Sequence, residues 1–478
     1  MKEKMKENQK KTVLSQEIEG QLSKAFADVD TNFEKYVDGV CRLIRHPSIS
    51  SLGQGLPECA QALAEMMQAS GIEDVKVVET KGAPLVLGSI DAQGPGAAEA
   101  PTLLVYGHYD VQPPEPLEAW DSPPFEPDIR DGRIYGRGTG DNKGQLLAHV
   151  FAVESLKRTC GHVPVNIKFL FEGEEESGSG ALLDFISENK EALAADLAFY
   201  SDGPMMENGQ AAVVFGARGV LGMEIVLRGA NRDVHSGNMG GPVPNPGWDL
   251  VQLLTSMKGP DGWVKVEGFY DNILSPSGLE LAALEGIAFD ADEFKRTYGI
   301  KKFAPGPGES FHEKLMFWPT MNIQGMVGGY TGKGMKTVTP AEMRVKMDMR
   351  LVANQDPEDI LEKVTGHIMS INPNAEIIVR HGTPPSKTPL DHPMAPAMIE
   401  ATRIGFEEEP VVVPCSGGTA PDYMFTSLLE IPLIIVPYAN PDEDNHAPNE
   451  NLRLDCLRAG IRTSIAAFLM LGSGANRE

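Results

Sequence analysis

Short apolar runs and stretches of helical periodicity alternate along the first 200 residues of the chain. Apolar side chains recur on one face of 33–44 and of 58–69, so both segments are predicted to be helices. The run "LLVY" at 103–106 is bounded by Pro101 and Gly107, as is typical of a buried strand. The same reasoning predicts strands at 165–173, 197–203 and 431–438, helices at 146–156 and 181–193, and a hairpin turn at Asp131-Gly132.

The middle of the chain has a different pattern. In 342–352 apolar and charged residues alternate, and 221–229 does the same, so one face of each segment is expected to be buried and the other solvated. Residues 356–371 are expected to form a helix with Asp356 as its N-cap and Pro357 in its first turn. One buried and one wet face favour an antiparallel α+β arrangement here.

Together, these patterns predict an α/β protein with two domains. The first is an α/β domain with a mostly parallel sheet, formed by residues 1–209 and 384–478. The second is an α+β domain at 210–383 that is inserted into the first. Segments that contain Pro and Gly flank the insertion on both sides and are suited to act as hinges.

The composition is that of a packed globular protein. The chain has 478 residues, of which 41% are hydrophobic and 23% charged, and its formal net charge is −25. This acidic total argues against nucleic acids and anionic membranes as partners, because both bind basic patches. No run of 18 or more apolar residues occurs, so no membrane span is expected.

Cysteine usage and the N-terminal segment bear on the cellular compartment. The five cysteines include no CxxC pair, which is typical of reduced thiols. The first dozen residues are charged and no apolar segment follows them, so we expect a solvated tail and no signal peptide. The sequence therefore predicts a cytoplasmic protein.

Polar residues follow the predicted strands, and the carboxyl ends of parallel strands meet at one edge of a sheet. They are His108 and Asp110, Glu175 and Glu176, Asp202, and His446. Imidazoles together with carboxylates suit divalent cations such as Zn²⁺ or Mn²⁺, and an adjacent carboxylate that binds no metal could act as a general base. Each motif alone also fits a plain turn or a solvated acidic loop. The segment "GRGTGDNKG" lacks the spacing of a nucleotide-binding loop.

The motifs taken together resemble a known family. "GHYDVQP", "GRGTGDNKG", "FEGEEESGSG", "YSDG", "RDVHSGNMGG", "KTVTP", "MRLV", "CSGGTAP" and "NHAPNEN" occur in the order and spacing of the M20 metallopeptidases. The chain looks most like the carnosinase-type cytosolic nonspecific dipeptidases, from about residue 30 to its end. The resemblance implies a catalytic domain and an inserted lid and dimerisation domain.

The resemblance also implies a pair of divalent metal ions, Zn²⁺ or Mn²⁺, in each subunit. His108 and Asp202 correspond to the ligands of one ion, and Glu176 and His446 to the ligands of the other. Asp141 corresponds to the carboxylate that bridges the two ions.

Three further positions near these ligands carry implied roles. Glu175 corresponds to the general base, although a register shifted by one residue would give that role to Glu174. Asp110 corresponds to a carboxylate that orients His108. Asn142 stands where the family usually has a second Asp, and the peptide bond between Asp141 and Asn142 is typically cis in relatives.

The inserted domain supplies the other implied site residues. His235 resembles a histidine that reaches the active site of the partner subunit and polarises the scissile carbonyl. Thr337 is similar to a residue that contacts the substrate from the partner chain. A terminal carboxylate of the substrate would be held by Arg350, Gly417, Gly418 and Thr419, although the family more often has Ser at position 419.

The resulting functional prediction is hydrolysis of the amide bond of dipeptides, or of similar small substrates with a free C-terminal carboxylate, in a homodimer. Water activated by two metal ions would be the nucleophile. An N-acyl amino acid amidohydrolase with the same site is the alternative. A non-catalytic relative that uses the fold for binding or assembly is a further possibility, against which the intact Glu175 argues.

Overall fold

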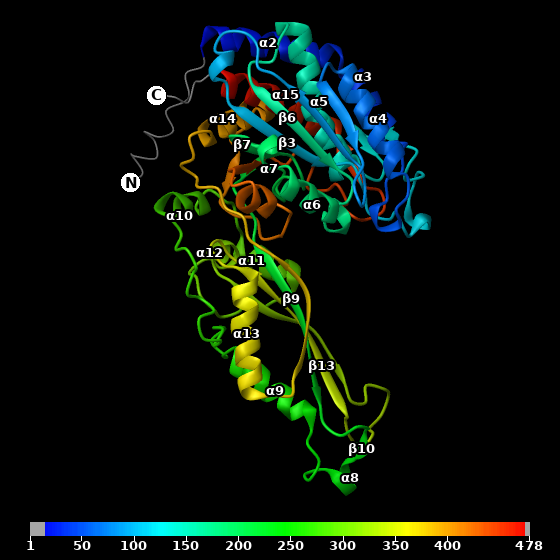
Figure 1. The fold of residues 1–478 in the computed structure, drawn as a ribbon, viewed down its shortest axis with the longest axis vertical. Helices are drawn as coiled ribbons and strands as arrows, with labels where there is room; N and C mark the ends of the chain where they lie inside the picture. Colours follow the sequence, from blue (N-terminus) through cyan, green and yellow to red (C-terminus); the bar gives the residue numbers. More distant parts are fainter. Residues whose placement is uncertain (1–14, 474–478) are drawn as a thin grey trace. The chain divides into compact units, whose positions relative to one another are not determined.

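The computed structural model describes residues 15–473, and the chain divides into two compact units (Figure 1). Unit 1 contains the chain up to Phe215, Thr388–Val413 and the chain from Met424 onward. Unit 2 contains Gly216–Lys387 and Pro414–Tyr423. The boundaries expected from the sequence, 209/210 and 383/384, lie a few residues earlier, and the short segment Pro414–Tyr423 was expected in the first domain. The dozen N-terminal residues expected to form a tail lie outside the described residues.

Unit 1 is built on an eight-stranded sheet that is mixed but mostly parallel, which confirms the predicted fold class. The central strand β3 pairs in parallel with β6 and β7, whereas β1 and β2 are antiparallel to their neighbours. In sheet order the strands are β1 (Glu73–Val78), β2 (Leu85–Ile90), β6 (Asn166–Glu172), β3 (Thr102–His108), β7 (Leu197–Tyr200), β16 (Leu433–Ile435), β8 (Ala212–Val214) and β15 (Val411–Val413). The predicted hairpin is β4 (Asp128–Arg130) and β5 (Arg133–Tyr135), joined by β17 (Asn451–Arg453).

Side chains on both faces of this sheet are buried. Leu103 and Val105 of β3 belong to the main core, and Tyr106, whose side chain alternates to the opposite face, packs against Tyr200 and Phe425. The helices of unit 1 are α2 (Gln16–Thr31), α3 (Phe33–Ile44), α4 (Leu56–Ala69), α5 (Gly144–Cys160), α6 (Gly180–Glu188), α7 (Lys190–Leu193), α14 (Ala395–Phe406) and α15 (Leu454–Gly472).

Helix α2 was not predicted, and the predicted helix at 181–193 is divided into α6 and α7. The buried residues of α2 form one narrow stripe in an otherwise polar segment, and the stripe packs on α5 and α15. This stripe consists of Ile18, Leu22, Ala25 and Val29. Four apolar residues at helical spacing are only a weak sequence signal for a helix, because most of the stability of this helix comes from its tertiary contacts.

Unit 2 contains a four-stranded antiparallel sheet with the order β11-β13-β9-β14. One face of the sheet packs on α9 and α13, and α13 begins at Pro357 with Asp356 as its N-cap, as predicted. The strands are β9 (Gly219–Arg228), β11 (Thr320–Gly328), β13 (Glu342–Leu351) and β14 (Glu376–Thr383), and β10 (Val234–His235) pairs with β12 (Val338–Thr339). The helices are α8 (Ser236–Met239), α9 (Pro246–Met257), α10 (Gly278–Leu284), α11 (Ala291–Tyr298), α12 (Phe311–Phe317) and α13 (Pro357–Ile371).

The polar face of β9 is buried, whereas the sequence predicted a solvated face. Glu224 on this face is 3% exposed, and its carboxylate accepts hydrogen bonds from Arg344 and Arg380 on the two flanking strands. Gly222 leaves room for the imidazole of His381, which would collide with a β-carbon there. The prediction was wrong because β9 is a central strand, so long side chains from both neighbours cover it.

Across residues 15–473, every helix is too short or too polar to span a bilayer.

Candidate metal centre

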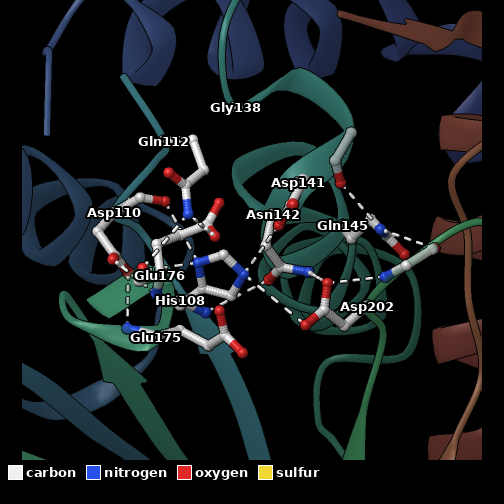
Figure 2. A network of polar contacts seen from close by, with 12 residues as sticks. His108, Asp110, Gln112, Gly138, Asp141, Asn142, Gln145, Glu175, Glu176 and Asp202 are labelled. Atoms are coloured by element: carbon white, nitrogen blue, oxygen red, sulfur yellow. Dashed lines mark hydrogen bonds and ion pairs between the residues drawn. The ribbon is translucent and has the colours of Figure 1, made fainter. Parts of the chain in front are cut away.

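The strand ends of unit 1 bring the predicted metal-binding residues to one edge of the sheet (Figure 2). His108 is the last residue of β3, and Asp202 follows β7, the parallel neighbour of β3. Glu176 follows β6, the parallel neighbour on the other side. Asp141 lies in the turn Thr139–Lys143 that leads into α5, and His446 lies in the loop after β16.

Asp141 is the residue that contacts both imidazoles. Its Oδ1 lies 3.0 Å from Nε2 of His108, and its Oδ2 lies 3.0 Å from Nε2 of His446. Asp202 Oδ2 lies 3.7 Å from His108 Nε2, and Glu176 Oε2 lies 3.2 Å from His446 Nε2. The five side chains therefore form two three-residue groups that share Asp141, and the potential ligand atoms in each group lie within 4.8 Å of one another.

The orientation of His108 fits a metal ligand. Its Nδ1 lies 3.2 Å from the carbonyl oxygen and 3.3 Å from the carboxylate Oδ1 of Asp110, so Nδ1 carries a proton. In the neutral ring, the lone pair is then on Nε2, which faces Asp141 and Asp202 (Figure 2). Nε2 is buried, and no partner among residues 15–473 forms a hydrogen bond of good geometry with it. A divalent cation beside Nε2 would satisfy the nitrogen and both carboxylates.

The electrostatics of the group favour a bound cation. Hydrogen bonds to Asp141 and Glu176 raise the pKa of His446 to about 10. Burial opposes the charged form of His108, but its contacts with Asp110, Asp141 and Asp202 outweigh burial and raise its pKa well above the ordinary value. The carboxylates thus hold positive charge at both imidazoles, and metal ions can supply that charge in place of protons.

Asp110 has a second function that the sequence did not reveal. Besides contacting Nδ1 of His108, its carboxylate accepts hydrogen bonds from the backbone N–H groups of Glu175 and Glu176, at 3.2 and 3.1 Å. The turn η5 (Glu175–Ser177) is therefore tied to the same carboxylate that orients His108. One buried side chain aligns the first metal-binding group with the two adjacent acids.

The three consecutive acids of this segment have different surroundings. Glu174 is directed elsewhere, and its carboxylate accepts hydrogen bonds from the N–H groups of Ala83 and Ala181. Glu176 contacts His446. Burial and the nearby Asp202, Glu176 and Asp141 raise the pKa of Glu175 well above the usual value, although His108 opposes the shift. This geometry favours Glu175 over Glu174 as a proton acceptor.

Three amides near the candidate metal-binding residues form hydrogen bonds that the sequence did not reveal, although the family resemblance had singled out Asn142. Asn142 Nδ2 donates to the carbonyl of Ser201 at 2.6 Å and to Asp202 Oδ1 at 3.2 Å. The neutral amide of Asn142 therefore holds Oδ1 of Asp202, while Oδ2 faces His108. Gln112 Nε2 donates to Glu176 Oε2 at 2.9 Å. Their partners lie 60 and 64 residues away in the sequence, which gives no local signal. The peptide bond between Asp141 and Asn142 is cis.

The third amide, Gln145, and the carboxylate of Glu450 fix the turn that carries Asp141. Gln145 Nε2 donates to the carbonyl of Gly140 at 2.8 Å. Glu450 accepts hydrogen bonds from the N–H groups of Gly138, Gly140 and Asp141, and its charge is paired with the buried Arg137. The position of Asp141 thus depends on a buried network that spans about 300 residues of sequence.

The candidate residues of unit 2 form two separate clusters. Arg350 Nη1 donates to Thr419 Oγ1 at 2.8 Å, next to Gly417 and Gly418. His235 Nε2 lies 3.4 Å from Thr337 Oγ1, and its Nδ1 accepts a hydrogen bond from Gly237 at 3.0 Å. The neutral imidazole of His235 therefore carries its proton on Nε2.

Comparison with known proteins decides the family. The sequence model of Peptidase family M20/M25/M40 matches residues 104–469 of the chain. The chain belongs to peptidase family M20. The Beta-Ala-His dipeptidase of Homo sapiens is 30% identical over 377 residues, which cover 77% of this chain and 74% of that protein. The Cys-Gly metallodipeptidase DUG1 of Saccharomyces cerevisiae is 27% identical over 470 residues, or 94% of this chain and 97% of that protein.

Solved M20 structures share the fold. The M20 family metallo-carboxypeptidase Sso-CP2 from Sulfolobus solfataricus superposes with a TM-score of 0.80 at 34% identity, covering 92% of this chain and 99% of that one. Human carnosine dipeptidase 1 gives a TM-score of 0.71 at 28% identity, covering 95% and 99%. The protein is thus a metallohydrolase of the M20 dipeptidase type, and its two groups around Asp141 fit the dinuclear site of this family.

Proposed function

We propose that this M20 metallopeptidase hydrolyses the amide bond of dipeptides that have a free C-terminal carboxylate. The observation that carries the proposal is the pair of metal-binding groups that share Asp141, with the partly buried Glu175 beside them. The names of the relatives, which describe dipeptidases of Beta-Ala-His and Cys-Gly, support the same class of substrate.

In the proposed site, His108, Asp141 and Asp202 hold one divalent ion, and Asp141, Glu176 and His446 hold the other. Zn²⁺ and Mn²⁺ both suit this set of nitrogen and oxygen ligands. When bound, such ions polarise a carbonyl group and lower the pKa of water. Asp110 keeps the lone pair of His108 directed at the first ion and holds the turn that carries Glu176.

Glu175 is the proposed general base. It accepts the proton of the attacking water and passes it to the nitrogen of the leaving amine, so the same oxygen serves as base and then as acid. A carboxylate with a raised pKa is suited to both steps, because transfer is most efficient when the pKa of the group lies near the working pH.

Arg350 is the proposed partner of the substrate's terminal carboxylate. Its Nη1 is directed at the hydroxyl of Thr419, and its Nε lies 3.5 Å from Asp348 Oδ2, so the guanidinium is held from two sides. Guanidinium groups bind carboxylates through two parallel hydrogen bonds. Gly417 and Gly418 allow close approach of a ligand to the adjoining loop.

We further propose that His235 and Thr337 act on the substrate of the partner subunit in a homodimer. Arg350 pairs with Val220 near the start of β9. β9 ends eight residues further along, at Arg228, and the chain then continues to His235. Eight residues of strand span about 26 Å. Figure 1 places β10 and α8 beyond this end of β9 and β13.

A dipeptide extends over about 7 Å. One substrate molecule therefore cannot reach Arg350 and His235 of the same chain. The His235 of a partner subunit can instead reach the substrate that Arg350 holds. Its Nε2–H would donate to the oxyanion, an interaction worth about 3 kcal/mol in other enzymes.

An exposed apolar surface on unit 2 offers a place for the second copy. Strand β11 is an edge strand, and Ile323, Met326 and Val327 on it are each about half exposed. Helix α9, whose end adjoins β11, exposes Trp248 and Val251. An edge strand with exposed apolar side chains is a template for pairing with another chain, and a twofold interface would cover both copies equally.

The proposed location is the cytoplasm. All five cysteines are free, four of them buried, as expected for a protein from a reducing compartment. The net charge of −25 disfavours nucleic acids and anionic membranes as partners.

The substrate class can be tested with matched panels. The enzyme, stripped of metal and reloaded with Zn²⁺ or Mn²⁺, is assayed for release of free amino acid from dipeptides and from N-acetyl amino acids with the same C-terminal residues. We expect metal-dependent turnover of the dipeptides. Preferential turnover of the N-acetyl compounds would instead identify an N-acyl amino acid amidohydrolase, and absence of turnover on both panels would contradict a hydrolytic function on these substrates.

The contribution of His235 in trans can be tested by subunit exchange. Glu175→Gln leaves His235 intact in a subunit without its base, and His235→Ala leaves the base intact. A mixed dimer of the two variants has one site with both groups, so we expect up to about half of the wild-type activity per mixed dimer. If mass spectrometry shows exchange and no activity returns, His235 does not act across subunits.

A further inference from the structure

Arg218 in unit 2 is a buried cation without a carboxylate partner. The residue is 7% exposed, and in residues 15–473 no Asp or Glu oxygen lies within 4.0 Å of its guanidinium. Burial lowers the pKa of its side chain. By contrast, the buried Arg137 of unit 1 is paired with Glu450 at 2.7 Å. Because burying an unpaired charge is costly, the isolation of Arg218 requires an explanation.

The hydrogen bonds of Arg218 all lead to the loop 416–419. Its Nε and Nη2 both donate to the carbonyl oxygen of Gly417, at 3.0 and 2.7 Å. Its backbone N–H donates to the carbonyl of Ser416 at 3.2 Å. Its own carbonyl accepts the hydroxyl proton of Thr419 at 2.7 Å. Arg218 thus contacts the loop at three residues, twice through its backbone and, at Gly417, through its guanidinium group.

The contact with Thr419 also determines how Arg350 is held. A hydroxyl group has one proton, and Thr419 donates it to Arg218. The lone pairs of Thr419 Oγ1 are then free to accept from Arg350 Nη1, which lies 2.8 Å away. A side-chain substitution at Arg218 keeps the backbone contact with Thr419 but removes the hydrogen bonds to Gly417, two residues before Thr419. The loop would then hold Thr419, and through it Arg350, less firmly.

Arg218 and Arg350 belong to one cluster of unit 2. Both are cationic and close enough to repel, and Asp348 lies 3.5 Å from Arg350 Nε. The contacts that hold the two guanidinium groups apart therefore determine where Arg350 can point.

We propose that Arg218 is a positioning residue for recognition of the substrate's terminal carboxylate, acting through the loop 416–419 and Arg350. The inference rests on the proposed function of Arg350. It goes beyond that function because it assigns part of the selectivity for a C-terminal carboxylate to a residue that need not touch the substrate.

The proposal predicts a particular kinetic pattern. Arg218→Met removes the charge and both hydrogen bonds to Gly417 but keeps an unbranched apolar side chain of similar reach. We expect KM for a free-acid dipeptide to rise by about tenfold to a hundredfold, the range for hydrogen bonds to charged groups. kcat should change by less than about threefold, and kcat/KM for the corresponding dipeptide amide should stay nearly unchanged.

The experiment compares L-alanyl-L-alanine with its C-terminal amide in the wild type and four variants. Arg350→Ala is the positive control. Arg380→Met, on the polar face of the same sheet and paired with Glu224, is the negative control and should behave as wild type. Arg218→Lys keeps the charge without the forked hydrogen bonds, and we expect it to restore part of the preference for the free acid. Metal content is measured for every variant.

The outcomes separate the two hypotheses. If the wild type does not prefer the free acid, the proposed recognition of the carboxylate by Arg350 is wrong, and the proposed role of Arg218 is wrong as well. If Arg350→Ala loses the preference but Arg218→Met keeps it, the role of Arg218 is wrong while that of Arg350 stands. Equal losses on acid and amide, in Arg218→Met or, should it not fold, in Arg218→Lys, would mean that Arg218 only stabilises the fold.

Discussion

The candidate metal-binding residues of unit 1 and the candidate substrate-contacting residues of unit 2 are held in different ways. In unit 1, His108 is 1% exposed, and it and Glu176 are each held by a further residue, Asp110 and Gln112 respectively. In unit 2, His235 is exposed, and its side chain contacts Gly237 and, beside the paired strand β12, Thr337. All five candidate metal ligands lie within unit 1, whereas His235 in unit 2 is exposed.

This difference indicates where each part of the chemistry is determined. Metal ligands must be aligned before the ion binds, so a buried and hydrogen-bonded arrangement suits them. In the proposed homodimer, His235 would complete the site of the other subunit and must therefore remain accessible until the dimer forms. The two regions should therefore respond differently to substitution.

The largest effect is expected at Asp141, because it belongs to both metal-binding groups. In Asp141→Asn we expect loss of both ions and a fall in kcat/KM of at least about a thousandfold, since metal ions contribute several kcal/mol to the stabilisation of the transition state. Asp202→Asn, which alters one group only, should retain the second ion. Metal content per subunit and turnover test this difference, which retention of both ions by Asp141→Asn would contradict.

A smaller and more selective effect is expected in unit 2. Arg350→Ala should keep both metal ions but lose the preference for free-acid dipeptides over their amides. The loss should be about 1.5–3 kcal/mol, the range for a hydrogen bond to a charged group. The ratio of kcat/KM for the two substrates measures it. An unchanged ratio would make Arg350 a structural residue of β13.

A third histidine, His149, contrasts with His108 because burial lowers its pKa, whereas contacts with carboxylates raise that of His108. His149 is equally buried, but its contacts are Ser464 and aromatic rings, and burial lowers its pKa to about 3. Between pH 6.5 and 3 the unfolded chain binds a proton at this residue and the folded chain does not. The free energy of unfolding therefore falls as the pH falls below 6.5.

The matching variant is His149→Gln. On going from pH 7 to pH 5, metal-free wild type should lose about 2 kcal/mol more unfolding free energy than this variant, and urea denaturation at the two pH values measures the difference. Equal losses in both proteins would show that His149 does not remain neutral in the fold.

The smallest effect is expected at Gln112, which donates to Glu176 but binds no metal itself. Gln112→Leu should weaken the affinity of the Glu176 group for its ion by about tenfold, as is common for residues that orient ligands. Titration with a competing chelator measures the affinity. Gln61→Leu, an exposed glutamine paired with Glu65, is the control and should leave the affinity unchanged.

The sequence predicted the elements that have strong local patterns. The helix at 33–44 has the bounds of α3, and the hairpin at Asp131-Gly132 is present, because apolar periodicity and turn residues determine both locally. Helix α2 and the burial of Glu224 were not predicted, because both depend on packing partners distant in sequence.

The same distinction holds in the site. His108, Glu176, Asp202 and His446 could be placed at one edge because each follows a predicted strand, whereas Asp141 and the orienting role of Asp110 came from the family resemblance. The geometry brings the five candidate ligands together. The hydrogen bonds that align them from distant positions could not be predicted. Asn142, Gln145 and Glu450 act through hydrogen bonds to backbone groups or side chains tens to hundreds of residues away.

The most direct test of the proposed chemistry compares the three consecutive acids. Glu174→Gln, Glu175→Gln and Glu176→Gln each replace one carboxylate by an amide of the same size, and metal content and turnover are measured for each. We expect Glu174→Gln to remain active, Glu176→Gln to lose metal, and Glu175→Gln to keep both ions while kcat falls by about a hundredfold to ten-thousandfold, the usual contribution of a general base. Full activity of Glu175→Gln, or equal metal loss in Glu175→Gln and Glu176→Gln, would contradict the assignment of Glu175 as the base.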